Sequence, residues 1–193
     1  MNPTEVNQLL RGRRAIFPKM YDNRPIPRPI LEDILENANW APTHRLTEPW
    51  RFVVFEGVAR ERLGKFLAAR YRETVAGEQF SELKYRKNLE KPTRSGAVIA
   101  ICMQRDSRER VPEWEELAAV ACSVQNMWLS CHAHGIGCYW SSTSLMLDEA
   151  AAGFLDLKAG QRCLGLFYMG YYEGPALPGK RTPIAAKTSW LDQ

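Results

Sequence analysis

The sequence predicts an α+β fold in which helices flank a central sheet of mixed or antiparallel strands. Stretches with apolar residues at helical spacing are interspersed with short continuous apolar runs, which are typical of buried strands. These elements follow one another without a regular strand–helix–strand rhythm, which disfavours a doubly wound parallel sheet. A long apolar stretch from about Glu113 to His134 predicts a buried helix at the centre of the fold.

Length and charge narrow the range of functions. The chain has 193 residues, enough for a substantial core, and we expect a single domain over residues 1–193. Its 45% apolar and 25% charged residues are typical of a globular protein. The net charge is only +4, and basic and acidic residues interleave from Glu61 to Lys91. A nucleic-acid-binding face would concentrate basic residues, so we expect no nucleic-acid partner.

The sequence also indicates a cytoplasmic protein with no membrane partner. The polar N-terminus lacks an apolar signal segment. The longest apolar helical stretch, Leu117 to Leu129, is shorter than the roughly 20 residues that a membrane span needs. The 5 cysteines lie in mostly apolar surroundings, so we expect reduced packing residues.

The N-terminal part is predicted to hold two helices separated by an irregular segment. Thr4 can cap the first helix, which Gly12 ends. Four prolines between Phe17 and Pro29 predict an extended segment. From Ile30 to Asn39 the apolar residues recur at helical spacing, so a second helix is expected to end at Trp40.

The middle of the chain is predicted to hold two buried strands around a charged helix. Phe52 to Phe55 is a continuous apolar run, as expected of a strand buried on both faces. Glu61 to Glu90 has one apolar stripe and predicts a helix, but its far end, Gly77 to Lys91, has weaker periodicity. We expect that end to be mobile and to shape a substrate pocket. Ala97 to Met103 predicts the second buried strand.

The C-terminal part begins with the long helix, which Pro112 opens and which is apolar on all sides from Leu117 to Leu129. Three shorter elements are then expected: a strand at Cys138–Trp140, a helix at Leu147–Phe154 and a buried strand at Cys163–Met169. The tail after Gly174 is rich in proline and glycine.

The loop between the second helix and the first strand concentrates polar side chains. Pro42 and Pro49 stop helix growth on its two sides, and Trp40 and Trp50 flank it. His44 lies between the prolines and is the candidate functional residue of the loop. From the local chemistry alone, an ordinary helix-to-strand connection with a solvent-facing histidine is as well supported as a binding loop.

Three motifs in order resemble the nitroreductase family of FMN flavoproteins. They are Arg13-Arg14, the turn Ala41-Pro42-Thr43-His44 followed by Glu48-Pro49-Trp50, and the late pair Lys180-Arg181 followed by Pro183 and Trp190. The resemblance runs from about residue 5 to the C-terminus. It implies the nitroreductase-like FMN-dependent fold, a homodimer with FMN sites shared between subunits, and NAD(P)H as co-substrate. It also implies ping-pong reduction of nitroaromatic, quinone or related small-molecule acceptors.

Within this resemblance, arginines would hold the flavin phosphate. Arg13, Arg14 and Arg181 match the family's phosphate-binding positions. The planar donor fork of arginine suits phosphate oxygens two at a time. Ala15 stands where the family usually has serine, so it can offer only its backbone N–H.

The remaining flavin contacts are implied by two further segments. In the short single-domain branch, the residues that match Trp40 and His44 contact the flavin of the partner subunit. Leu46 replaces the asparagine of the commoner pattern. Trp140, Ser141 and Ser142 match a loop that runs along the isoalloxazine ring or the ribityl chain. No side chain is identified as a catalytic acid or base.

Other functions stay open at the level of the sequence. A flavin enzyme of this family could instead catalyse dehalogenation, dehydrogenation or flavin cleavage. A non-enzymatic FMN-binding or metal-binding module is a further alternative, because Cys131 and His134 share a helix face and Cys138 follows. That set lacks the fourth ligand that zinc prefers. Gly135-x-Gly137 lacks the third glycine of a dinucleotide fingerprint, so no separate NAD domain is predicted.

Overall fold

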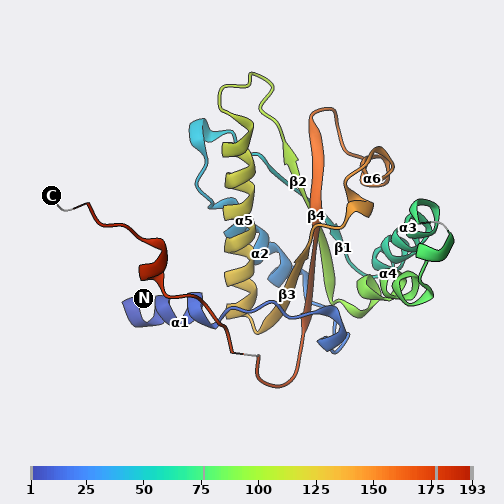
Figure 1. Ribbon diagram of the computed structural model, residues 1–193, viewed down its shortest axis with the longest axis horizontal. Coiled ribbons are helices and arrows are strands. Elements are labelled where there is room, and N and C mark those ends of the chain that lie inside the picture. Colours follow the sequence, from blue (N-terminus) through green and yellow to red (C-terminus); the bar gives the residue numbers. More distant parts are fainter. Residues whose placement is uncertain (1, 76, 177, 192–193) are drawn as a thin grey trace.

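The computed structural model describes residues 2–75, 77–176 and 178–191. The described part contains a four-stranded antiparallel sheet in the order β1-β2-β4-β3 (Figure 1). The strands are β1 (Trp50–Phe55), β2 (Ala97–Gln104), β3 (Ile136–Ser141) and β4 (Gln161–Tyr171). The predicted α+β class is therefore confirmed, and the sheet is of the antiparallel kind.

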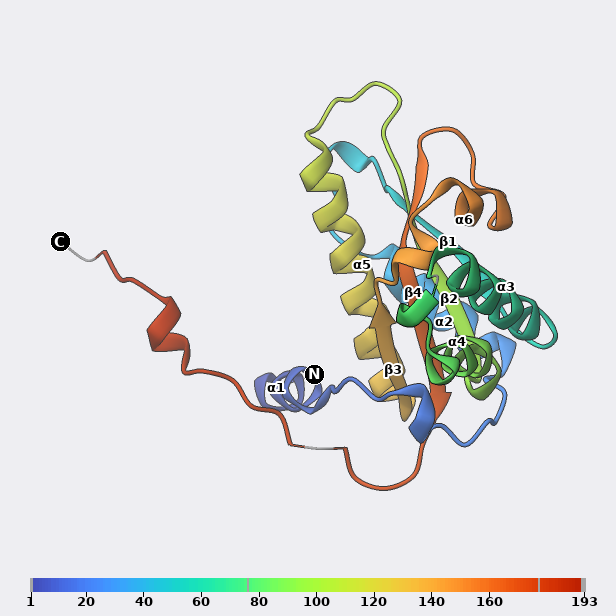
Figure 2. The ribbon, with the colours of Figure 1, turned by 45° about the vertical axis from the view of Figure 1, so that its right-hand side comes forward.

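Helices cover both faces of the sheet, giving three layers (Figure 1). On one face lie α2 (Arg28–Asn39) and α5 (Glu113–Ala133). On the other lie α3 (Ala59–Thr74), α4 (Glu82–Arg94) and α6 (Glu149–Phe154). The first helix, α1 (Pro3–Gly12), lies beside the C-terminal end of α5, and the C-terminal tail runs away from the layers (Figure 2).

The central strand β2 divides the core. Ile99, Ile101 and Met103 point toward α2 and α5, whereas Val98 and Ala100 point toward α3 and α6. This alternation follows from the two-residue period of a strand. Because helices cover both faces, the predicted burial of Ala97–Met103 is confirmed.

The burial predicted for Phe52–Phe55 is wrong. Only Trp50 and Phe55 are buried in β1, and Arg51 and Val54 are exposed. The reason is topological: β1 is an edge strand that pairs with β2 alone, so one of its long sides is not covered by the sheet. An apolar run does not distinguish an edge strand from a central one.

The predicted helix Glu61–Glu90 is also wrong as a single element, because α3 and α4 are separate and a 3₁₀ turn at Gly77–Gln79 lies between them. Most of the segment that we expected to be mobile is regular helix, capped by the Ser81 side chain, which accepts a hydrogen bond from Lys84 N. Its apolar spacing is weak because α4 buries little of its surface.

A smaller correction concerns the start of α1. Asn2, not Thr4, is the N-cap, and its side chain accepts a hydrogen bond from Glu5 N at 3.0 Å. The Glu5 side chain in turn accepts one from Asn2 N, which completes a capping box.

The long helix is not buried on all sides, contrary to the prediction. Ala119, Val120 and Met127 are fully or almost fully buried on its inner face. Its outer face is exposed along a continuous stripe at helical spacing: Trp114, Leu117, Ala118, Ala121, Cys122 and Gln125. Trp114 is 68% exposed and Leu117 is 41% exposed. In this single chain, therefore, a continuous, mainly apolar stripe of α5 is not used for packing.

The cysteines are all free, and Cys122 differs from the other four because it is exposed. No helix in the described part of the chain combines the length and apolar composition that a membrane crossing requires.

Candidate functional site

Arg13 and Arg14 lie directly after α1, at the C-terminal end of α5. The Arg13 guanidinium lies over the Trp128 ring, 4.6 Å from its centroid. Arg14 donates from Nη1 to its neighbour's carbonyl, Arg13 O, at 2.7 Å. The tail returns to this place, because a Cβ atom on Gly179 would meet the Arg14 guanidinium at 2.6 Å. Glycine is therefore what allows the tail to approach so closely.

Positive charges gather at this place. Burial lowers the pKa of Arg13, and the charges of Arg181 and then Arg14 lower it further. Among the residues that the structure describes, neither Arg13 nor Arg181 forms an ion pair. The three predicted phosphate-binding arginines are thus brought together, and their mutual repulsion favours an anion between them.

His132 is a neighbour of this cluster that sequence reasoning missed. Its Nε2 edge lies against Gly12, where an added Cβ would be only 2.6 Å away. Burial lowers the pKa of His132, and the charges of Arg13 and Arg14 lower it further. No local signal could have found it, because its position depends on how α1 packs on α5.

Ala15 connects the arginines to the edge of the sheet. It forms an isolated parallel bridge with Cys138 of β3, and Ile16 N donates to Cys138 O at 2.9 Å. The next two residues of β3 point to opposite faces: Tyr139 toward α4 and Trp140 toward α5. In the described part of the chain, the buried Nε1 of Trp140 has no hydrogen-bond acceptor.

Ser141 and Ser142 end β3 over a glycine. Gly165 of β4 has a φ of +129°, and a Cβ there would meet Ser141 O at 2.4 Å. Glycine at this position therefore lets the Ser141–Ser142 backbone lie directly on β4. Ser141 is half-buried and Ser142 is exposed.

A cavity of about 670 Å³ opens between these segments. Phe17 and Lys19 line it from the segment after Ala15, Tyr139 lines it from β3, and Lys87 and Lys91 line it from α4. The Phe17 and Tyr139 ring centroids are 4.7 Å apart. This volume lies within the range of roughly 300–1,000 Å³ typical of small-molecule sites.

The lysines of α4 were missed as site residues. Lys84, Lys87 and Lys91 recur at i, i+3 and i+7, so they share one helix face. The sequence carried that signal, but the alternating charges of the segment concealed it.

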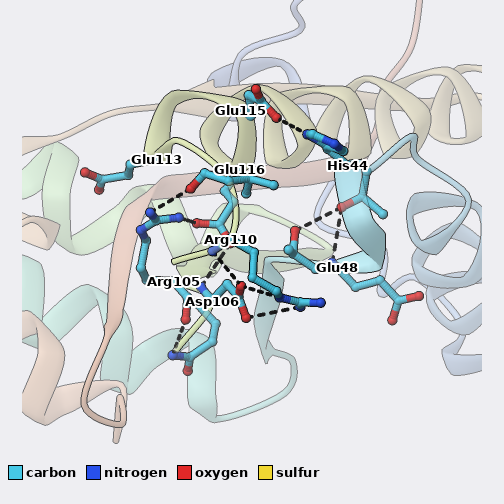
Figure 3. A network of polar contacts seen from close by, with 12 residues as sticks. His44, Glu48, Arg105, Asp106, Arg110, Glu113, Glu115 and Glu116 are labelled. Atoms are coloured by element: carbon cyan, nitrogen blue, oxygen red, sulfur yellow. Dashed lines mark hydrogen bonds and ion pairs between the residues drawn. The ribbon is translucent and has the colours of Figure 1, made fainter. Parts of the chain in front are cut away.

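Trp40 directly follows α2, and His44 lies at the opposite end of α5 from the arginines. Trp40 is 79% exposed, and its Nε1 donates to Glu36 Oε1 at 2.9 Å. His44 begins a 3₁₀ turn, His44–Leu46, and its Nδ1 lies 2.6 Å from Glu115 Oε2 in the first turn of α5 (Figure 3). Leu46, the residue in place of the family's asparagine, is also 79% exposed.

The loop that carries His44 is strained but firmly held. Arg45, Leu46 and Glu48 have φ angles of 52°, 52° and 42°, which residues other than glycine rarely adopt. The Thr43 hydroxyl lies 3.2 Å from the Thr47 hydroxyl and accepts a hydrogen bond from Glu48 N at 3.2 Å. Strained backbone of this kind clusters at functional sites. Hydrogen bonds within the loop therefore hold this strained backbone in place.

One chain does not bring His44 together with the arginines. His44 contacts Glu115 in the first turn of α5, whereas Arg13 contacts Trp128 near its end. At a rise of roughly 1.5 Å per residue, Glu115 and Trp128 are about 20 Å apart along the helix.

Comparison with known proteins identifies the fold and the family. The model of the nitroreductase family matches residues 10–171. The chain belongs to the nitroreductase family. YfhC of Bacillus subtilis, provisionally named an NAD(P)H nitroreductase, is 29% identical over 180 residues, which cover 93% of this chain and 90% of YfhC.

Solved structures of nitroreductases share the fold. A nitroreductase-like family protein from Bacillus cereus matches with a TM-score of 0.82 at 24% identity, covering 100% of this chain and 99% of its own. The FMN-dependent nitroreductase NfnB from Mycobacterium smegmatis, in complex with NADPH, matches with a TM-score of 0.75 at 18% identity. The match covers 97% of this chain and 98% of the NfnB chain. The nitroreductase-like fold that the sequence predicted is confirmed.

Beside His44, this nitroreductase-family chain has a paired polar network (Figure 3). Arg105 is bonded to Glu116, which is only 1% exposed and also accepts from Asp106 N at 2.9 Å. Arg110 Nε donates to Asp106 Oδ2 at 2.8 Å. The hydrogen bonds from Arg110 are the main reason that the pKa of Asp106 falls to about 2. Asp106 and Glu116 thus each have an arginine partner, which fixes the N-terminal end of α5.

The residues of the zinc alternative do not form one site, because Cys131 and Cys138 lie together in the core and His134 is bonded elsewhere. His134 Nε2 lies 3.0 Å from Asp33 Oδ2, whereas Cys131 and Cys138 lie in the core. Within the described ranges, no group of three or more His, Cys, Asp or Glu residues is arranged to hold a metal ion.

Proposed function

We propose that this protein is an FMN-dependent oxidoreductase that takes hydride from NAD(P)H and reduces nitroaromatic, quinone or related acceptors. The observation that carries the proposal is the gathering of Arg13, Arg14 and Arg181, in which Arg13 and Arg181 form no ion pair with the residues that the structure describes. A cavity lined in part by the Phe17 and Tyr139 rings opens on the segment that follows the two N-terminal arginines. The names of relatives support it, because YfhC is named for NAD(P)H and NfnB is FMN-dependent.

The arginine cluster fits the phosphate of FMN. A phosphate dianion would offset the repulsion between Arg13 and Arg181, and guanidinium donors suit its oxygens. Ala15 adds no side-chain donor, so phosphate binding would depend on the arginines. FAD fits less well because it needs more room beyond the phosphate. Riboflavin fits less well because it lacks the phosphate.

The cavity fits the flavin ring in size and lining. Phe17 and Tyr139 offer aromatic surface, and Lys87 and Lys91 place positive charge beside it. Bound FMN would supply the hydride chemistry, whereas the chain binds it, orients it and limits the access of water. Trp140, Ser141 and Ser142 are not among the residues that line this cavity, but they directly follow Tyr139, so we retain them as proposed ribityl or ring contacts.

One cleft is proposed to serve reductant and acceptor in turn. The sequence contains no dinucleotide fingerprint, so NAD(P)H must dock against the flavin. The oxidised nicotinamide then has to leave before the acceptor enters, which predicts a ping-pong mechanism.

The purified protein tests this function directly. It should be yellow, and the released cofactor should be FMN. Anaerobic NAD(P)H should bleach the flavin without an acceptor, and initial-rate plots against both substrates should give parallel lines. A colourless protein that fails to take up FMN would refute the proposal, and intersecting lines would refute the ping-pong mechanism.

We further propose a homodimer in which each site is shared. The exposed apolar stripe on α5 is suited to a second copy. His44 contacts Glu115 in the first turn of the same helix, and Trp40 at the end of α2 is exposed. Because His44 lies far from the arginines of its own chain, its flavin contact would be with the cofactor of the partner. FMN would then stabilise the dimer by mass action.

Mixing two variants tests the shared site. In a heterodimer of His44→Ala and Arg13→Ala chains, one site carries both defects and the other is intact. Exchange of subunits should therefore restore tight FMN binding at about half of the sites in each heterodimer. If exchange is proven and the mixture binds FMN no better than either variant alone, the site is not shared.

A further inference from the structure

A second, smaller cavity of about 330 Å³ adjoins the first. The end of α3, one face of α4 and the loop after Ser142 line it. Lys87 and Lys91 line both cavities, whereas Lys84, Thr143 and Ser144 line only the smaller one. A ligand held in the smaller cavity would therefore lie next to the proposed flavin site.

The charge of the smaller cavity is of one sign. Its lining includes Lys84, Lys87 and Lys91 and no acidic residue. Thr143 and Ser144 contribute neutral hydroxyl-bearing side chains at the opposite wall. The combination of ammonium and hydroxyl donors is suited to a carboxylate or a phosphate.

Helix α4 keeps its paired and unpaired cations on separate faces. Arg86 pairs with Glu82 at 3.3 Å, and Arg94 pairs with Glu90 at 2.9 Å. Nowhere in ranges 2–75, 77–176 and 178–191 does a carboxylate form an ion pair with the three cavity lysines. The acidic residues of α4 thus neutralise the arginines and leave the cavity positive.

Lys91 shows the effect of this imbalance. It is half-buried, and burial lowers its pKa, as does the charge of Lys87 to a smaller extent. A half-buried cation beside another cation, with no acid to offset them, favours an anionic ligand.

From this geometry we propose that the smaller cavity binds the anionic group of the acceptor, so that the preferred acceptors are aromatic compounds carrying a carboxylate. The inference rests on the proposed function and names its substrate class. The volume suits a single ring with its carboxylate and is too small for a whole dinucleotide. The shared chemistry is an anion, and a phosphate of the reductant is the competing source.

The test uses 4-nitrobenzoate and 4-nitrobenzamide, which have similar size and shape but differ in charge. With the FMN-loaded protein, kcat/KM should favour the benzoate by about tenfold, mainly through KM. Lys84→Gln should remove most of this preference for the benzoate. Lys84 is chosen because it lines the smaller cavity and not the larger one. Lys65→Gln, on the exposed surface of α3, is the matched control and should leave the preference unchanged.

Two further measurements separate the explanations. The affinity of the FMN-loaded protein for 4-nitrobenzoate, measured by calorimetry, should fall about tenfold in Lys84→Gln. This measurement tests the cavity even if the protein reduces neither compound. Failure of reduction with binding intact would count against the proposed function alone. If Lys84→Gln lowers the preference for NADPH over NADH and leaves benzoate binding unchanged, the anion is the phosphate of the reductant and our assignment is wrong. The assignment is also wrong if the natural protein and Lys84→Gln bind 4-nitrobenzoate equally well and the preference for NADPH over NADH does not change.

Discussion

The two ends of α5 handle charge in opposite ways. At its N-terminal end, Arg105 pairs with Glu116 and Arg110 pairs with Asp106, and Glu115 is hydrogen-bonded to His44 (Figure 3). At its C-terminal end, Arg13 lies close to Arg181, and neither forms an ion pair in the described part of the chain.

This difference separates structural charge from ligand-binding charge. A buried carboxylate with a bonded arginine stabilises one arrangement of the chain and needs nothing else. Cations gathered without acids destabilise each other until an anion arrives. Substitutions in the network of Arg105, Asp106 and Glu116 should therefore change folding, and substitutions at the unpaired end should change binding.

The largest effect is expected at the paired end. Glu116→Gln removes the negative charge that pairs with the Arg105 guanidinium. Because Glu116 is buried, Arg105 is then left without a carboxylate partner at this site. The melting temperature of the FMN-free protein should fall by roughly 5–10 °C, because breaking a buried pair by removing one partner is strongly destabilising. Glu113→Gln is the matched control in the same helical turn, since its pair with Arg162 is half-exposed. Equal, small shifts in melting temperature for both variants would show that the buried Arg105–Glu116 pair contributes no more to stability than the half-exposed pair.

At the unpaired end, Arg181→Ala should act on binding. FMN affinity should fall about tenfold to a hundredfold, because a charge-assisted hydrogen bond contributes roughly 1.5–3 kcal/mol. Riboflavin affinity should change little, since riboflavin has no phosphate. The melting temperature of the FMN-free protein should not decrease, because Arg181 forms no ion pair with the residues that the structure describes.

Fluorescence titration with both flavins measures the effect of Arg181→Ala, and Lys187→Ala serves as an exposed control in the same tail. An equal loss of affinity for FMN and riboflavin would remove the phosphate role from Arg181. A loss of stability without ligand would instead assign it to the structural charges.

The sequence predicted the layers better than it predicted their surfaces. The spacing in Ile30–Asn39 and the apolar run in Ala97–Met103 were enough, because local pattern determines those elements. Phe52–Phe55 was misjudged, since the position of a strand within a sheet depends on pairing far along the chain. The outer stripe of α5 was misjudged for a related reason: an apolar side chain has the same pattern whether it faces a core or another chain.

The candidate site divides in the same way. Resemblance identified Arg13, Arg14 and Arg181, which the fold then brings together from the two ends of the chain. His132 and Glu115 were missed because only the packing of α5 places them beside Arg13 and His44. Side chains of this kind have no motif of their own.

The smallest effect concerns Asp106, at the edge of the paired network. Arg110 lowers the pKa of Asp106 from its ordinary value of 3.8 to about 2 in the folded chain. A lowered folded-state pKa means that the stabilisation is complete above about pH 4 and is lost as the pH falls through 2. The asparagine of the Asp106→Asn variant cannot titrate, so the variant should be less stable than the natural chain at pH 7, and the difference should disappear near pH 2.

Melting temperatures between pH 2 and 7 measure this difference in stability. Asp156→Asn is the control, because the pair of Asp156 with Lys158 is exposed. Parallel curves for Asp106→Asn and the natural chain would show that Arg110 does not couple Asp106 to folding, and the paired network would then end at Glu116.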